Sequence, residues 1–417
     1  MKLTYTHTRI GCYINFFLDA VVNVYLGLCF VTWIDEFGVD IVDLAKMSCI
    51  IFGVQAVLIP VAAIITGKIG FRRAAVIMQI FYCIGISGLG IFPYVMPTPF
   101  SGLVTAAVIF ALGNGICEAI NPPIIESLPL KNKDTQMSCL HSSFSIGQII
   151  VILVSTLFFI TVGRDHWQIL AIIFGMIALC NMVIFLKAPF GKLVEEKDRT
   201  PLKQIIGKKM FLILVVMIIC TGPIEFCMAN WTSLFAEQAL HVSKTVGDLL
   251  GPCLFAVGMA SSRLFFGLKG ANIDMDKFMM YSCLGCCLSF PVVAFSPVPL
   301  LCLIACGLVG LTTGIVCPGC ICDLSKSFPK GGVPMFGAMM LFQYLGGSAE
   351  EYMVGSVTNY VQIHVPQICL DMFPVTDPYE LGLRTALFFV SWVATLMFIF
   401  SCLSYRYIKK HGIRRQV

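Results

Sequence analysis

Glu118 is the residue whose type and position say most about chemistry in this sequence. It lies within residues 113–147, in an apolar stretch of helical length, three residues before Asn121 and four before Pro122. A charge near the centre of a bilayer costs at least about 2.5 kcal/mol, so such residues usually face a polar cavity or a partner. A buried carboxyl group favours its protonated form, which lets it carry a proton between the two sides of a membrane. Glu118 is therefore predicted to couple to protons; the alternative is a structural carboxyl group held by Asn114, by Asn121 or by a neighbouring helix.

The other ionisable side chains inside apolar stretches are mostly acidic. They are Asp19, Glu225, Glu350 and Glu351, whereas the basic ones at comparable depth are His141 and Arg263. A buried anion normally needs Arg or Lys beside it, so a small-molecule ligand is predicted to be neutral or cationic. Glu225 is predicted as a second proton-coupling residue. Glu350 and Glu351 would point about 100° apart on a helix, so at most one of them can face a cavity.

The elements that position these residues follow from the composition. The chain has 417 residues, of which 58% are hydrophobic and 12% charged, and its mean hydropathy is +0.89. Soluble domains typically carry about 25% charged residues. Repeated apolar stretches of about 20 residues therefore predict an all-α protein with many membrane-spanning helices. Most of the 20 cysteines lie inside these stretches and are interpreted as packing residues, so no metal site and no cofactor is predicted.

Twelve apolar segments are predicted to be transmembrane helices, near 10–34, 45–66, 74–93, 99–123, 136–161, 166–187, 209–236, 246–268, 277–296, 298–323, 332–361 and 380–407. Basic residues gather on one side of this topology, and only Lys46, Arg164, Lys244 and Arg384 fall on the other. Because basic loops stay in the cytoplasm, both termini are predicted to be cytoplasmic, in a plasma membrane such as a bacterial inner membrane. The net charge of +5 then reflects topology rather than nucleic-acid binding.

Residues 188–208 are the only long polar interruption, and they divide the chain into six-helix halves at 1–187 and 209–417. The halves match at an offset of about 200 residues, a pattern typical of internal repeats. The matched glycines are Gly67 and Gly267, Gly115 and Gly314, and Gly147 and either Gly346 or Gly347. Glycine-rich membrane helices would explain one match, but not three in register. Two such halves with a site between them at mid-membrane form a known transporter plan.

The twelve segments, the central basic loop and the turn Gly67, Gly70, Arg72, Arg73 resemble the major facilitator superfamily. This resemblance implies a gate on the cytoplasmic side at Gly67, Arg72 and Arg73, with Arg263 in the second-half counterpart. The acidic residue of the family's turn is absent here, because Lys68-Ile69-Gly70 occupies its place. Arg263 is expected to cap helix ends or to pair with Asp323.

A more specific resemblance is to the fucose–galactose–glucose:proton symporter family. It is carried by Glu118 with Asn121-Pro122, by His141-Ser142-Ser143-Phe144 with Gly147, and by Gly222-Pro223-Ile224-Glu225 with Trp231. The resemblance implies that Glu118 takes the place of a fourth-helix glutamate implicated in proton coupling and sugar binding. The family's first-helix aspartate falls on Gly27 here, and Asp19 lies about two helical turns earlier.

Sugar recognition normally combines amides with aromatic faces, and the sequence offers both in its apolar segments. The predicted substrate-binding residues are Asn23, Asn121, His141, Gln148, Trp231 and Gln343. Each has a plain alternative, since the chain contains 33 Phe and an aromatic residue is more often a packing residue. Pro122, Pro123 and Pro223 are expected to break helices near these residues and to free backbone carbonyls.

These features predict a secondary transporter rather than an enzyme, acting as a monomer in the lipid bilayer. The expected activity is proton-coupled symport of a neutral sugar or polyol by alternating access. Proton-coupled export of cationic or amphipathic small molecules stays open as an alternative, because carboxylates in an apolar cavity suit those compounds too. An intramembrane enzyme is disfavoured, because neither His-Glu-x-x-His nor Gly-x-Ser-x-Gly occurs, and no P-loop indicates a nucleotide-driven pump.

Overall fold

A computed structural model describes residues 3–129, 133–191, 200–269, 273–328, 331–365, 375 and 377–412 of the chain. Within these ranges the regular secondary structure is helical and contains no strand. The predicted all-α class is confirmed. The central part of the predicted loop at 188–208, residues 192–199, lies outside the described ranges.

The first six predicted segments correspond to six long helices. These are α1 (Tyr5–Phe37), α2 (Ile41–Ile69), α3 (Phe71–Leu89), α5 (Pro99–Ser127), α6 (Lys133–Thr161) and α7 (Trp167–Lys187). A short helix α4 (Phe92–Val95) and a 3₁₀ turn η1 (Arg164–His166) lie in the connections. Each predicted segment overlaps its helix along most of its length.

The last six segments also form helices, but three of them consist of two helices each. The helices are α9 (Lys209–Asn230), α10 (Thr232–Gln238), α11 (Lys244–Leu250), α12 (Pro252–Lys269), α13 (Met275–Phe295), α14 (Pro299–Thr313), α15 (Val316–Ser327), α16 (Gly332–His364) and α18 (Pro378–His411). A short helix, α8 (Leu202–Ile206), precedes them inside the predicted loop at 188–208. The breaks fall at Trp231, at Gly251 and at Gly314-Ile315. Gly251 precedes Pro252, whose missing N–H ends the hydrogen-bond ladder of α11.

The expectation that prolines break the helices near Glu118 and Glu225 is wrong. Pro122 and Pro123 lie inside the continuous helix α5, and Pro223 lies inside α9. Membrane helices tolerate internal proline because neighbouring groups satisfy the freed carbonyls. The helix break beside Glu225 falls later, at Trp231.

Several helix ends follow directly from the local sequence. Thr98 caps α5 and exchanges hydrogen bonds with Ser101, and Pro99 occupies the first turn. Asp377 caps α18 by accepting from the backbone N–H of Glu380 at 2.9 Å, and Gly412 ends that helix with a φ of 62°. Short polar side chains and proline at the start, and glycine at the end, satisfy or avoid the unpaired backbone groups of helix termini.

The chain forms two compact units. Unit 1 contains Met1–Tyr25, Ile50–Ile205 and Lys330–Tyr344, and unit 2 contains Leu26–Cys49, Ile206–Pro329 and Leu345–Val417. The C-terminal part of α1 and the N-terminal part of α2 therefore belong to unit 2, although in the sequence they lie between two segments of unit 1. The start of α16 belongs to unit 1 in the same way.

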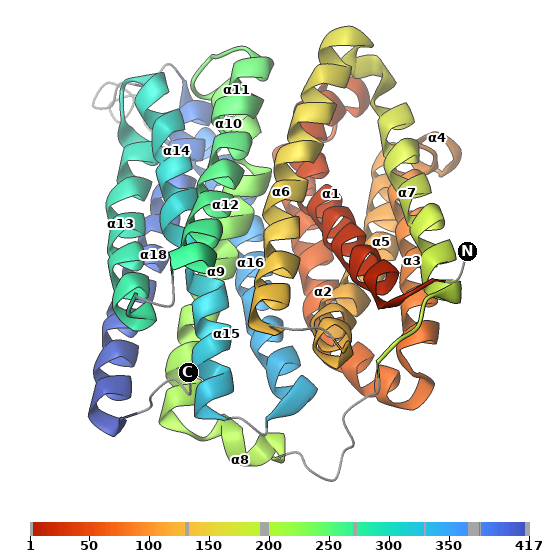
Figure 1. Cartoon of the computed structure of the whole chain (residues 1–417). Coiled ribbons are helices and arrows are strands. Elements are labelled where there is room, and N and C mark those ends of the chain that lie inside the picture. Colours follow the sequence, from red (N-terminus) through yellow and green to blue (C-terminus); the bar gives the residue numbers. More distant parts are fainter. Residues whose placement is uncertain are drawn as a thin grey trace. The chain divides into compact units, whose positions relative to one another are not determined.

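In unit 1, α3 packs along both α5 and α7 (Figure 1). A Cβ atom at Gly85 would lie 2.3 Å from the backbone nitrogen of Phe110, so α3 and α5 touch backbone to backbone. In unit 2, α13 packs on α14 and α18, and α12 packs on α14. There a Cβ at Gly258 would lie 2.2 Å from the carbonyl oxygen of Gly307. Small residues at such crossings are how membrane helices associate closely.

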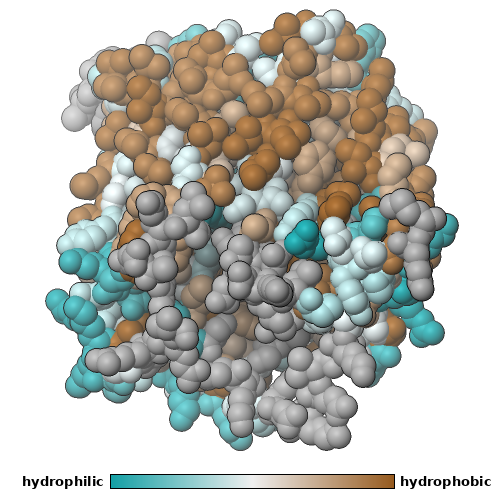
Figure 2. All heavy atoms as spheres, viewed as in Figure 1, coloured by the Kyte–Doolittle hydropathy of each residue, from teal (hydrophilic) through white to brown (hydrophobic). Residues whose placement is uncertain are grey.

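The outer faces of the helices are apolar. Large hydrophobic side chains are exposed along α6, including Ile150, Leu157 and Ile160, and along α7 and α13. Figure 2 shows hydrophobic side chains gathered over one part of the visible face and hydrophilic ones toward one end. Ten helices of the described part are long and apolar enough to cross a membrane, and α3 and α16 match the other two predicted segments. The chain is an integral membrane protein.

Candidate functional site

Unit 1 holds two neighbouring carboxyl groups, of which Asp19 is buried and Glu118 is half-buried. Asp19 of α1 is 2% exposed, and Asn23, one turn further on, donates to its Oδ1 at 2.7 Å. The Asp19 carboxyl group also interacts with Asn114 and Glu118 of α5. Two neighbouring carboxyl groups away from water cannot both be ionised at low cost, so such a pair shares a proton. The structure thus brings together Glu118, which the sequence singled out, and Asp19, to which it assigned no role.

Amide side chains next to this pair form a network across four helices. Asn15 of α1 donates to Asn121 at 2.8 Å and accepts from Gln79 of α3 at 2.6 Å and from Asn181 of α7 at 2.8 Å. Asn121 also donates to the carbonyl of Cys12 at 3.2 Å. All four amides are buried. Asn15, Gln79 and Asn181 were not predicted, although each is a polar residue inside an apolar segment, which is the signal that could have found them.

Other amides of unit 1 keep hydrogen-bonding atoms unused. Gln148 of α6 is 2% exposed, and its Oε1 has no partner within the described part of the chain. The same holds for Oδ1 of Asn23 and for both amide atoms of Gln55 on α2. Buried polar atoms are nearly always hydrogen-bonded, to protein, water or ligand. These amides are therefore suited to bind a hydroxyl-bearing molecule, and Gln55 is a candidate that sequence reasoning missed.

His141 and Gln343 are the other substrate-binding candidates in unit 1. The His141 ring of α6 lies 5.5 Å from the ring of Phe16. A Cβ at Gly147 would lie 3.0 Å from the Cβ of Ala20, which brings α6 close to α1. Gln343 of α16 is 6% exposed, beside Tyr344, whose ring lies 6.1 Å from that of Phe52. Helix α6 therefore approaches α1 near His141, and α16 approaches α2 near Gln343.

In unit 2, two residues that were predicted separately form one ion pair. Arg263 lies 3.8 Å from Oε1 of Glu225, and its Nε donates to the carbonyl of Gly314 at 3.0 Å. Of the two expectations for Arg263, the capping of a helix end is confirmed, because Gly314 is the C-cap residue of α14. Pairing with Asp323 is wrong, because Asp323 pairs with Lys326 at 3.1 Å. The carbonyl of Gly314 is available because the helix breaks between α14 and α15.

Trp231 is fully buried at the break between α9 and α10. Its Nε1 donates to Oε2 of Glu351 at 2.6 Å, and Asn230 donates to Oε1 of the same carboxyl group at 2.6 Å. The ring of Phe30 lies 5.4 Å from the Trp231 ring. Glu351 therefore fixes the orientation of the predicted substrate-binding Trp231.

The predicted gate turn is built around a helix end. Gly70 has a φ of 82° and precedes α3. Arg72 donates to the carbonyls of Phe185 and Ala188 at 2.8 Å each, where α7 ends. Its guanidinium group also lies 5.3 Å from the ring centre of Phe190. Gly67 and Arg73 are exposed.

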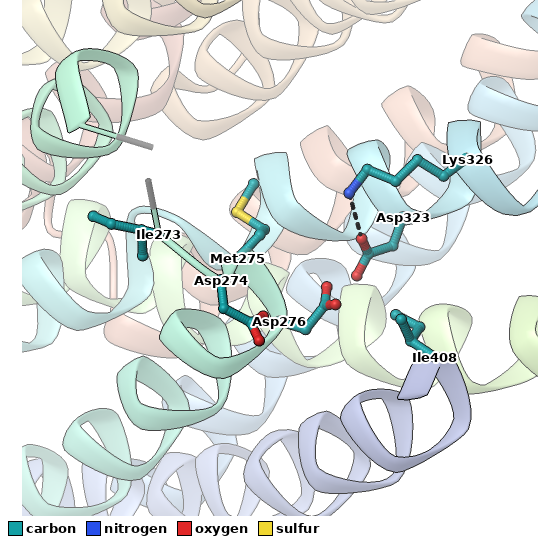
Figure 3. A pocket seen from close by; sticks show the side chains of 7 residues that line it. All are labelled: Ile273, Asp274, Met275, Asp276, Asp323, Lys326 and Ile408. Carbon is teal, nitrogen blue, oxygen red and sulfur yellow. Dashed lines mark hydrogen bonds and ion pairs between the residues drawn. The ribbon is translucent and has the colours of Figure 1, made fainter. Parts of the chain in front are cut away.

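A small pocket of about 220 Å³ lies in unit 2 between α13, α15 and α18. Figure 3 shows Lys326 pointing to Asp323, with Asp276 on the opposite side of that carboxyl group. The pocket is smaller than the roughly 300–1,000 Å³ typical of ligand sites. Among the residues with a described position, no group of three or more His, Cys, Asp and Glu is placed to hold a metal ion.

Buried carboxyl and amide groups inside units of apolar helices are typical of membrane transporters, in which they line the path of substrates and ions. The sequence model of the Major Facilitator Superfamily matches residues 12–349. The chain belongs to this superfamily and is a membrane transporter. A comparison with curated protein sequences found no match.

Solved structures of transporters share the fold over nearly the whole chain. A bacterial homologue of the human lysosomal transporter Spinster, in an inward-facing and occupied conformation, has a TM-score of 0.76 at 12% identity, over 99% of this chain and 98% of that one. A D-xylose-proton symporter has a TM-score of 0.72 at 13% identity, over 92% and 96%. The E. coli fucose:proton symporter FucP has a TM-score of 0.66 at 15% identity, over 96% and 99%. The predicted resemblance to the family of this last protein is confirmed, and at these identities it is a likeness of fold.

Proposed function

We propose that this transporter carries out proton-coupled symport of a neutral sugar or polyol by alternating access. It acts as a monomer in a plasma membrane with both termini in the cytoplasm. The two six-helix halves, 1–187 and 209–417, move so that the substrate site opens to one side of the membrane at a time, and residues 188–208 connect them on the cytoplasmic side. The observation that carries the proposal is the contact between Asp19 of α1 and Glu118 of α5.

This carboxyl pair has the properties that proton coupling requires. Both groups lie inside membrane-spanning helices, and the surrounding polar groups are the amides of Asn23 and Asn114 rather than cations. Because the two carboxyl groups come from different helices, a movement of α1 against α5 changes whether they share a proton. Proton binding then favours one arrangement of the helices, which links proton movement to the transport cycle.

The charge distribution supports a neutral substrate. The buried basic side chains of the described part are Lys244, Arg263 and Arg384, and each is paired with a carboxylate of unit 2. No buried cation of this part is left for an anionic substrate, whereas Gln55, Gln148 and Asn23 keep unused amide atoms for hydroxyl groups. Two of the transporters with the same fold are described as a D-xylose-proton and a fucose:proton symporter.

The other predicted site residues have different roles in this proposal. Gln148, His141, Asn23 and Gln343 of unit 1 are the proposed substrate-binding residues, and Trp231 of unit 2 stays a separate candidate. Asn121 acts chiefly by holding α5 against α1, since its amide is occupied by Asn15 and Cys12. Glu225 stays a second proton-coupling candidate, and its ion pair with Arg263 would have to open before it could bind a proton. Gly67, Arg72, Arg73 and Arg263 support the gate on the cytoplasmic side.

The test is the pH change outside de-energised vesicles that contain the protein, after addition of single sugars such as D-xylose or L-fucose. Wild type is compared with Asp19→Asn and Glu118→Gln. Asp43→Asn is the matched control, because it also removes a carboxylate from a membrane helix, but one that pairs with Lys46 at 2.9 Å and is partly exposed. Counterflow of the same sugar is measured in each protein.

We expect the external medium to become alkaline with wild type and with Asp43→Asn. This pH change should be lost in Asp19→Asn and Glu118→Gln, while counterflow of the sugar remains. Counterflow without any pH change in all four proteins would overturn proton coupling. If no sugar gives either signal, the sugar assignment falls. Proton uptake into the vesicles driven by export of an organic cation would then establish the alternative function.

A further inference from the structure

The buried carboxyl groups of unit 2 fall into two sets according to their partners. Asp248 pairs with Lys244 at 3.1 Å and Glu380 with Arg384 at 2.9 Å, and Glu225 has Arg263 at 3.8 Å. Glu350 and Glu351 of α16 have no such cation among the residues whose positions are described. An ionised carboxylate inside a membrane protein is costly when no cation compensates it. Glu350 and Glu351 therefore need something other than a cation to lower the cost of their negative charge.

Glu351 is surrounded by hydrogen-bond donors. Asn230 and Trp231 donate one N–H to each of its two oxygens, both at 2.6 Å. Ser48, at the start of α2, also interacts with this carboxyl group. Donors on both oxygens stabilise the ionised form of a carboxyl group. Glu351 is thus suited to carry the negative charge of the pair.

Glu350 has the opposite surroundings. It is 4% exposed, and neither of its oxygens accepts a hydrogen bond within the described structure. The titratable groups that face it are the Cys227 thiol of α9 and Glu351 itself. A thiol is a weak donor, and the neighbouring carboxylate repels a second negative charge. Among these groups, the weak thiol donor of Cys227 is the one that favours the ionised form of Glu350.

We propose that Glu350 is a proton-binding site in the C-terminal half of the transporter. A proton from water adds to its carboxylate, so that Glu350 is neutral while Glu351 keeps the single negative charge of the pair. This site is separate from Asp19 and Glu118, and it does not depend on which substrate the protein carries.

The proton on Glu350 has a structural consequence within unit 2. Glu351 holds Asn230 and Trp231, and these are the residues against which the second part of α1 packs. A Cβ at Gly27 would lie 2.5 Å from the carbonyl oxygen of Asn230, and Phe30 contacts Trp231. When Glu350 loses its proton, either two charges stand on consecutive residues or Glu351 takes up a proton and becomes a poorer acceptor. The first change adds repulsion between neighbouring carboxylates, and the second weakens the hydrogen bonds that hold Asn230 and Trp231.

Carbodiimide labelling tests the proposal in the unmodified protein. Dicyclohexylcarbodiimide is apolar and reacts with protonated carboxyl groups, and peptide mass spectrometry locates the modified residues. The full chain in lipid vesicles is labelled without substrate. Glu380 is the matched control in the same molecule, because it is equally buried but paired with Arg384. We expect several-fold more label on Glu350 than on Glu380 or Glu351.

The proposal is overturned if Glu350 carries no more label than Glu380 while Asp19 or Glu118 is modified. Label on Asp19 or Glu118 shows that the reagent reaches the membrane interior, so poor access would not explain the result. The label on Glu118 is scored separately, so this proposal and the proposed function can fail independently. Infrared spectroscopy gives a second readout that needs no reagent. The C=O band of protonated carboxyl groups should lose the intensity of one group in Glu350→Gln and keep it in Glu351→Gln. An unchanged band in Glu350→Gln would also overturn the proposal.

Discussion

Two pairs of carboxyl groups inside the helices, one pair in each unit, are built in different ways. Asp19 and Glu118 come from α1 and α5, so their contact lasts only while these helices stay in register. Glu350 and Glu351 are consecutive residues of α16, and no helix movement can separate them. In the second pair, the part that can change is the set of donors to Glu351, which are Asn230 at the end of α9 and Trp231 in the break that follows it. A pair that spans two helices is suited to sense helix movement, whereas a pair on one helix is suited to keep a proton and redistribute it.

The largest effect is expected at the pair that spans two helices. Asp19→Asn and Glu118→Gln should each lower substrate accumulation in energised vesicles by more than about tenfold, which equals about 1.4 kcal/mol. The reason is that an amide cannot share the proton. The double variant should be no worse than either single one, because residues that act as a unit are not additive. Additive losses would show that the two carboxyl groups work independently. Asp43→Asn serves as the control.

The next effect concerns stability at the pair on one helix. Glu351→Ala leaves the N–H groups of Asn230 and Trp231 without acceptors, and each unsatisfied buried donor costs about 1–3 kcal/mol. We expect a clear fall in the midpoint of thermal unfolding in detergent. Trp231→Phe in the same background should recover part of the loss, since it removes one of the orphaned donors. Glu350→Ala is the matched control with a smaller fall, because no donor depends on it. Equal falls for both alanine variants would contradict this difference.

The sequence predicted the helices well because apolar length is a property of each segment alone. All twelve segments are helical, and the one-residue breaks at Trp231 and Gly251 were missed because apolar residues continue on both sides. The prolines at 122, 123 and 223 were given too much weight, since a membrane helix can contain them.

The carboxyl pairs show where sequence reasoning stopped. Glu118 was found because a lone carboxylate stands out in an apolar segment, but its contact with Asp19 depends on how α1 and α5 pack, which no local pattern encodes. The family position for the first-helix aspartate falls on Gly27. There the absence of a side chain lets α1 approach the backbone of Asn230. Only the packing shows that α1 contacts a carboxyl group of α5 through Asp19 and approaches the backbone of Asn230 at Gly27.

A third prediction converts a paired carboxyl group into an unpaired one. Arg263→Gln removes the cation 3.8 Å from Glu225, which leaves this buried carboxylate in the situation of Glu350. We expect carbodiimide label to appear on Glu225 in Arg263→Gln and to stay low in Arg263→Lys, which keeps the charge. Label on Glu225 that is already high in wild type would mean that this ion pair does not hold Glu225 ionised. Glu225 would then gain support as a proton-coupling residue.

The smallest effect is expected from the reverse change, in which Glu350 gains a partner. Cys227 is fully buried and presents its thiol to Glu350. Cys227→Ser replaces a weak donor by a hydroxyl group of similar size, and a donor to the charged form favours ionisation. The label on Glu350 should therefore fall modestly in Cys227→Ser and stay unchanged in Cys227→Ala, which offers no donor. A fall of the same size in both variants would indicate a change in packing around α9 rather than in hydrogen bonding. Because serine and alanine differ here only by the hydroxyl group, this comparison isolates what a single donor contributes to the protonation of Glu350.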